Sequence, residues 1–215
     1  MNLIIVIFQI FVLFIIFSGK DVNADLSASQ LSALENIESY LNNIKTLRAK
    51  FSQFTEDGKI VNGKIYLSKP GKIRFEYEKP SPILIIGTKG WIIYENKSIN
   101  QISEYPTKQT PLAFLLEKEF KFDANDIKIN RLDVEEGYIE INLLHKRTFN
   151  KSTLTIVFEN NPIKLRKWKI VDSQGKPISI SLFNIEKNIS IDESLFIFTF
   201  PPNYTGPSKP QSPDM

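Results

Sequence analysis

The sequence predicts an α+β fold in which a large antiparallel sheet dominates and two helices accompany it. Three observations lead to this prediction. Residues 63–77 alternate between apolar and polar side chains on both sides of a Lys-Pro-Gly turn, as a β-hairpin does. Strand-length runs separated by turn formers fill the second half of the chain. Helix signals occur at residues 31–47 and 110–116.

The amino terminus is predicted to be an export signal. Residues 3–17 are apolar except for Gln9, and Val22-Asn23-Ala24 gives a small-x-Ala cleavage pattern before Asp25. No basic residue precedes the apolar run, so an uncleaved anchor is the alternative, although about fifteen apolar residues fall short of the roughly twenty that span a bilayer. We expect cleavage of residues 1–24, one domain over residues 25–204 and a disordered Pro-rich tail over residues 205–215.

The first helix is expected from residue 31 to about residue 47, with Ser27 or Ser29 as its cap. Its apolar residues recur at steps of three and four, which gives one apolar stripe, formed by Leu31, Leu34, Ile37, Leu41, Ile44 and Leu47. The period then changes to two, so residues 49–54 are predicted to form a strand that ends at an Asp57-Gly58 turn.

The hairpin at residues 63–77 is expected to present one apolar wall. Pro70 suits the first central position of a type II turn, and Gly71 tolerates the positive φ of the second. The apolar residues of the two strands share a face, and they are Val61, Ile65 and Leu67 before the turn and Ile73, Phe75 and Tyr77 after it.

Residues 83–86 and 91–94 are predicted to be strands that are apolar on both faces, so both faces must be covered. A short second helix is predicted with Thr110 as N-cap and Pro111 as its first residue. Its residues 112–116 are apolar nearly all round, which requires burial against protein or ligand. Further strands are expected at residues 138–144, 153–158, 163–171, 178–185 and 195–200, in one sheet that curls into a barrel or half-barrel.

The sequence carries no recognisable catalytic or metal-binding motif. It has no cysteine and a single histidine, His145, so no transition-metal cluster is expected and no cofactor is assigned. The acidic run at residues 133–136 is interpreted as a solvated loop. The net charge is only +3, and the basic cluster at residues 164–169 is typical of a solvated strand face, so no nucleic-acid partner is expected. An enzyme is therefore disfavoured.

An ordered set of segments resembles the periplasmic outer-membrane lipoprotein carrier family, the LolA family. The set runs through roughly residues 25 to 204, and it comprises Phe51-Ser52-Gln53, the Gly63–Tyr77 hairpin, Trp91-Ile92-Ile93-Tyr94, Thr110-Pro111-Leu112, Trp168 ahead of Asp172-Ser173-Gln174-Gly175, and Phe198-Thr199-Phe200-Pro201-Pro202. The resemblance implies an incomplete, half-open β-barrel covered by an α-helical lid, in a protein of the periplasm that is expected to be a monomer.

The resemblance also implies a function and a site. The function is to bind the acyl chains of lipoproteins and shuttle them from the inner to the outer membrane. The partners are acylated lipoproteins, an inner-membrane ABC-type lipoprotein release complex and, where one exists, an outer-membrane acceptor. That acceptor is itself a lipoprotein, and a chain without cysteine cannot be lipidated in that way. The expected ligand-binding residues are Val61, Ile65, Leu67, Ile73, Phe75, Tyr77, Ile85, Trp91, Ile93, Leu112, Leu115 and Leu116.

Lys69 stands where the family commonly has an arginine before the turn proline, and the resemblance assigns it to polar contacts that hold the lid to the sheet. Lysine lacks the planar fork of arginine, so the latch is expected to be weaker or differently arranged here. Two other functions remain open. One is an exported lipid- or peptide-binding sheet protein without shuttle activity, and the other is a lipid hydrolase.

Overall fold

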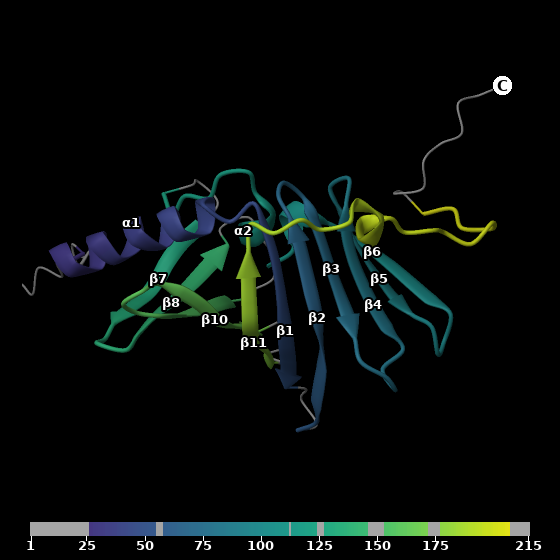
Figure 1. Ribbon diagram of the computed structural model, residues 1–215, viewed down its shortest axis with the longest axis horizontal. Helices are drawn as coiled ribbons and strands as arrows, with labels where there is room; N and C mark the ends of the chain where they lie inside the picture. The colour runs from purple at the N-terminus through teal and green to yellow at the C-terminus, as the bar shows by residue number, and fades with distance from the viewer. Residues whose placement is uncertain are drawn as a thin grey trace, which may run out of the picture.

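The computed structural model describes residues 26–54, 58–111, 113–123, 127–145, 153–171 and 177–206 (Figure 1). The expected signal segment, the tail beyond residue 206 and Leu112 lie outside these residues. The described strands are β1 (Thr46–Phe54), β2 (Ile60–Ser68), β3 (Lys72–Tyr77), β4 (Ile83–Thr88), β5 (Trp91–Asn96), β6 (Gln101–Pro106), β7 (Ile127–Val134), β8 (Tyr138–His145), β9 (Thr153–Glu159), β10 (Lys164–Val171) and β11 (Pro177–Lys187). The described helices are α1 (Ala28–Asn42), α2 (Ala113–Leu116) and the 3₁₀ turns η1 (Thr107–Gln109) and η2 (Glu193–Phe196).

All eleven described strands belong to one antiparallel sheet, in the order β6-β5-β4-β3-β2-β1-β11-β10-β9-β8-β7. Two series of hairpins, β1 to β6 and β7 to β11, join where β1 pairs with β11. The two edges, β6 and β7, do not pair with each other. The sheet is therefore open, and the prediction of a mainly antiparallel, incomplete barrel is confirmed.

The sheet curls strongly about its middle strands. Phe75 on β3 and Trp168 on β10 meet edge to face with ring centroids 6.3 Å apart. Their strands are four places apart in the sheet, which in a flat sheet is roughly 19 Å. Since both rings are almost fully buried, the curl gives the sheet a concave face that holds the core and a convex outer face.

Helix α1 lies on the concave side over the β7–β10 half of the sheet (Figure 1). Its cap is Ser27, which with Gln30 forms a capping box. The Gln30 amide also donates to the Leu132 carbonyl on β7 at 2.9 Å, and the Leu165 N–H donates to the Tyr40 hydroxyl at 3.1 Å. The helix ends at Asn42, before the expected residue 47, because Leu47 already points inward from β1.

Three other expectations need correction. Strands β6 and β7 are not among the predicted elements, and Asp133 lies in β7 and not in a solvated loop. Residues 195–200 do not form a strand, because the Asp192 side chain accepts from the Ser194 N–H and starts η2. The chain then continues across the convex face of β3 to β6 (Figure 1). Thr110 is not the N-cap of α2: it is the C-cap of η1, where its hydroxyl donates to the Thr107 carbonyl, and α2 begins only at Ala113.

Candidate functional site: an apolar trough under a lid

The expected apolar wall forms the concave face of β2, β3 and β4. Cross-strand neighbours share a face in an antiparallel sheet, and the register pairs Ile65 with Phe75, Leu67 with Ile73, and Phe75 with Ile85. Val61 and Tyr77 extend this row toward the far end of the hairpin. We call this wall, with its neighbours Leu47, Ala49 and Phe51 on β1, the trough. Apart from the half-buried Val61, its side chains between Leu47 and Phe75 are at most 2% exposed.

Trp91 and Ile93 do not belong to this wall. The register pairs Ile93 with Ile86 and Trp91 with Thr88, on the convex face, and it is Ile92 that faces the core. This corrects the expectation that Trp91 and Ile93 line the trough. Because β5 is apolar on both faces, its sequence pattern could not show which side faces inward.

Gly63 makes room in the trough for an aromatic side chain from β1. A Cβ atom at Gly63 would stand 2.5 Å from Phe51 Cζ and would also meet the Glu76 carbonyl oxygen. The Phe51 ring therefore lies directly over the glycine, where it contacts the rings of Phe75 and Tyr77 edge to face. At this end of the trough the Tyr77 hydroxyl donates to Gln53 Oε1 at 2.6 Å, and burial raises the pKa of Tyr77.

The connection between β6 and β7 covers the open side of the sheet. These two strands are opposite edges, so the chain between them must pass from one edge to the other. Its helix α2 buries Phe114, Leu115 and Leu116 in the same cluster as the trough and α1. Leu115 and Leu116 therefore lie in the same buried cluster as the trough, and their role in binding cargo stays a prediction. We call α1 together with described residues 107–123 the lid.

Polar contacts hold the two parts of the lid together. The Asn42 amide donates to the Phe120 carbonyl at 3.0 Å and its oxygen accepts from the Phe120 N–H at 2.7 Å. The Glu38 carboxylate accepts from the Phe122 N–H at 2.7 Å. Sequence reasoning missed both residues, and no local pattern marks them, because their partners lie about 80 residues away along the chain.

The β2–β3 turn binds both lid helices at their C-terminal ends. Lys69 Nζ donates to the Leu41 carbonyl at 2.8 Å, and the Gly71 N–H donates to the Leu116 carbonyl at 2.9 Å. These carbonyls lie in last turns, where helix oxygens lack partners within the helix. Gly71 has the expected positive φ, 79°, and the Lys69–Pro70 peptide is cis. Lys69 is therefore placed between the sheet and α1.

Burial of the Lys69 ammonium lowers its pKa from 10.5 to about 8, with repulsion from Lys45 acting in the same direction and Glu117 opposing it. Between pH 8 and 10.5 the unfolded chain then binds more protons at this position than the folded chain, so this group makes stability rise with pH. We expect the free energy of unfolding of Lys69→Leu to lack that rise, a difference of about 1 kcal/mol once the partial solvent exposure of the ammonium is allowed for. Urea titrations of both proteins at pH 7.5 and 9.5 measure it, and parallel pH profiles would contradict it.

Comparison with known proteins places the chain in a family. The family model described as "Outer membrane lipoprotein carrier protein LolA" matches residues 42–199. The chain belongs to the LolA family. Among individual relatives, an uncharacterised protein of Rickettsia prowazekii is 30% identical over 176 residues, which cover 82% of this chain and 81% of that protein. The outer-membrane lipoprotein carrier protein of Pseudomonas paraeruginosa is 28% identical, over 81% of this chain and 87% of the relative.

Solved structures include a LolA superfamily protein from Nitrosomonas europaea, with a TM-score of 0.41 and 9% identity over 79% of this chain and 97% of that one. The family assignment therefore rests on the sequence comparisons. LolA family carriers are not enzymes, which agrees with the expectation from the sequence. Among the described residues, no group of acidic or histidine side chains could hold a metal ion. No helix in the same part of the chain has the length and apolar character needed to cross a bilayer.

Proposed function

We propose that this protein is a periplasmic carrier that holds the acyl chains of lipoproteins in the trough and shuttles them from the inner to the outer membrane. Membership of the LolA family supports the proposal. The observation that carries it is the contrast between two kinds of contact. The lid covers the trough through apolar side chains, which acyl chains can replace, whereas its polar contacts with the β2–β3 turn are few, namely those of Lys69 with Leu41 and of Gly71 with Leu116.

The energetics explain why such an arrangement suits a carrier. Moving one acyl chain of about fourteen methylenes into water costs roughly 11 kcal/mol, so a lipoprotein with several chains does not leave a membrane unaided. In the closed form, Leu115, Leu116 and the α1 side chains occupy the apolar wall themselves. Acyl chains would replace these contacts when the lid opens, and the closing lid would compete with them when an acceptor removes the cargo.

The proposed partners follow from this role. Acylated lipoproteins would be the cargo, an inner-membrane ABC-type release complex would supply them, and an outer-membrane acceptor would receive them. The signal segment at residues 1–24 would direct the chain to the periplasm. Lys69 would act as the latch, because its ammonium group joins the β2–β3 turn to the C-terminal end of α1.

The test is transfer of cargo between membranes by the purified protein. We expect it to release acylated lipoprotein, and not a deacylated form, from donor vesicles and to deliver it to acceptor vesicles. Lys69→Leu should fold and bind cargo but deliver it several-fold more slowly, whereas Lys97→Leu, the same charge change at an exposed turn, should deliver normally. Binding of apolar probes without any transfer by the unaltered protein would instead favour a lipid- or peptide-binding protein that does not shuttle.

A further inference from the structure

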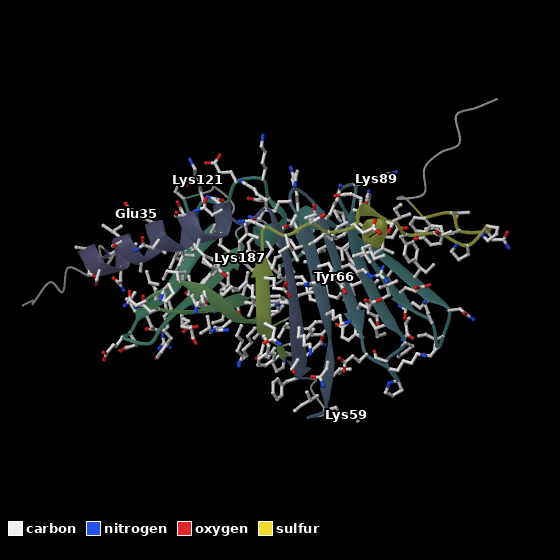
Figure 2. All side chains as sticks on the ribbon, in the orientation of Figure 1. Glu35, Lys59, Tyr66, Lys89, Lys121 and Lys187 are labelled. Atoms are coloured by element: carbon white, nitrogen blue, oxygen red, sulfur yellow. The ribbon has the colours of Figure 1, made fainter. Side chains whose placement is uncertain are left out.

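A hollow on the convex face, away from the trough, has the features of a second binding site. It lies at the junction of β2, β1 and β11 and has a volume of about 270 Å³, and it is lined by Arg48, Ala49, Lys50, Lys64, Tyr66, Asn184 and Glu186. Figure 2 labels Tyr66, on β2 in the middle of the sheet. The pairing of β1 with β11 shifts between Arg48 and Lys50, and Asn184 takes a left-handed φ of 49°. This β-bulge interrupts the regular surface of the sheet at the hollow.

The hollow concentrates uncompensated positive charge. Lys50 on β1 stands directly opposite Lys64 on β2, a like-charged cross-strand pair that destabilises a sheet unless something offsets it. Neither ammonium group has an ion-pair or hydrogen-bond partner within the described ranges. Glu76 is opposite Lys64 on the other side, but its carboxylate pairs with Arg74 at 3.2 Å.

The remaining polar groups of the hollow are arranged as donors. Arg48 uses Nε and Nη2 to bind the two oxygens of Glu186, at 3.2 and 2.7 Å. This fork orients the guanidinium, occupies the carboxylate that lines the hollow and leaves Nη1 free to donate. Tyr66 stands opposite Arg48 in the register, and Asn184 adds an amide. Three cations and one carboxylate therefore line the hollow, together with neutral donors from β2 and β11.

We propose that this hollow binds a phosphate-class anion, either free phosphate or the phosphate of a lipid headgroup. A tetrahedral anion with several acceptor oxygens matches ammonium and guanidinium donors that converge from two neighbouring strands. It would also relieve the repulsion between Lys50 and Lys64. Because these side chains alternate with Ala49 and Ile65, which face the core, the anion and the cargo would occupy opposite faces of the same two strands.

The first test is calorimetric titration of the purified protein with inorganic phosphate in low-chloride buffer. The double variant Lys50→Gln/Lys64→Gln should bind phosphate about tenfold or more weakly. The matched control is Lys167→Gln/Lys169→Gln, which removes two positive charges from β10 outside the hollow and should bind within about twofold of the unaltered protein. Equal losses in both double variants would assign the binding to diffuse charge and overturn the proposal, as would an absence of phosphate binding.

The second test identifies the source of the anion. Flotation with phosphatidylglycerol vesicles and with phosphatidylcholine vesicles is compared for the same three proteins, with and without inorganic phosphate as competitor. A lipid headgroup is supported if the protein binds vesicles, if the Lys50→Gln/Lys64→Gln variant does not, and if inorganic phosphate displaces the bound protein. Binding of inorganic phosphate without any binding of vesicles supports a small soluble phosphate. Binding of an acidic peptide that phosphate does not displace would overturn the proposal in favour of a protein partner.

Discussion

Replacing Gly63 by alanine should lower the free energy of unfolding by about 2 kcal/mol or more. The added Cβ would stand 2.5 Å from Phe51 Cζ and would meet the backbone oxygen of Glu76. The carbonyl cannot move without breaking the β2–β3 pairing, in which Gly63 is opposite Tyr77. Displacement of the Phe51 ring would in turn disturb its edge-to-face contacts with Phe75 and Tyr77. The trough should therefore lose both stability and shape.

Urea denaturation measures this effect, and Gly137→Ala is the matched control. A Cβ at Gly137, in the turn between β7 and β8, has no heavy atom within 4 Å, and its φ lies outside the left-handed region. The control should unfold within about 0.5 kcal/mol of the unaltered protein. Equal denaturation midpoints for the two variants would show that Phe51 does not occupy the space above Gly63.

Replacing Asn42 by alanine should loosen the lid. The Asn42 side chain satisfies both the N–H and the carbonyl of Phe120, and these backbone groups become unpaired in the variant. Loss of such partners in a partly buried place costs about 1–3 kcal/mol. We expect faster hydrogen exchange of the amides of residues 113–123, with much smaller changes in β8 and β9, and tighter retention of an acylated cargo because the closed form competes less well.

Asn43→Ala is the control for the lid variant. Asn43 is the next residue, is exposed, and its amide makes only a 3.4 Å contact to the Ser39 hydroxyl. Its exchange pattern should match that of the unaltered protein. If Asn42→Ala exchanges no faster than Asn43→Ala over residues 113–123, the reciprocal hydrogen bonds with Phe120 do not hold the lid closed.

The sequence predicts those strands in which one face is buried and the other is exposed to solvent. The hairpin of β2 and β3 shows this, since Ile65 and Phe75 alternate with charged residues and the structure pairs them as expected. Edge strands give a weaker signal because edges carry polar side chains. β6 and β7 were missed for this reason. Residues 195–200 alternate like a strand, but the Asp192 cap starts η2 and the segment packs over the convex face, where η2 contacts β3 and β4.

The candidate site was predictable only in its local part. The β2–β3 wall and the position of Lys69 follow from pairing within one hairpin. The inward face of β5 does not, because Trp91, Ile92 and Ile93 are all apolar and only the register with β4 selects Ile92. Contacts such as that of Asn42 with Phe120 depend on how the connection between the two sheet edges crosses the trough. A pattern of neighbouring residues contains no information about such contacts.

The central claim is that acyl chains enter the concave face beneath the lid, and site-specific photo-cross-linking tests it most directly. Tyr77 and Trp91 are half-buried aromatic residues of the same sheet, on the concave and the convex face respectively. Each is replaced in turn by benzoylphenylalanine, and the protein is loaded with acylated or deacylated lipoprotein. We expect cross-links from position 77 to the acylated form alone and none from position 91. Equal cross-linking from both positions, or cross-linking from 77 that does not depend on acylation, would contradict the account.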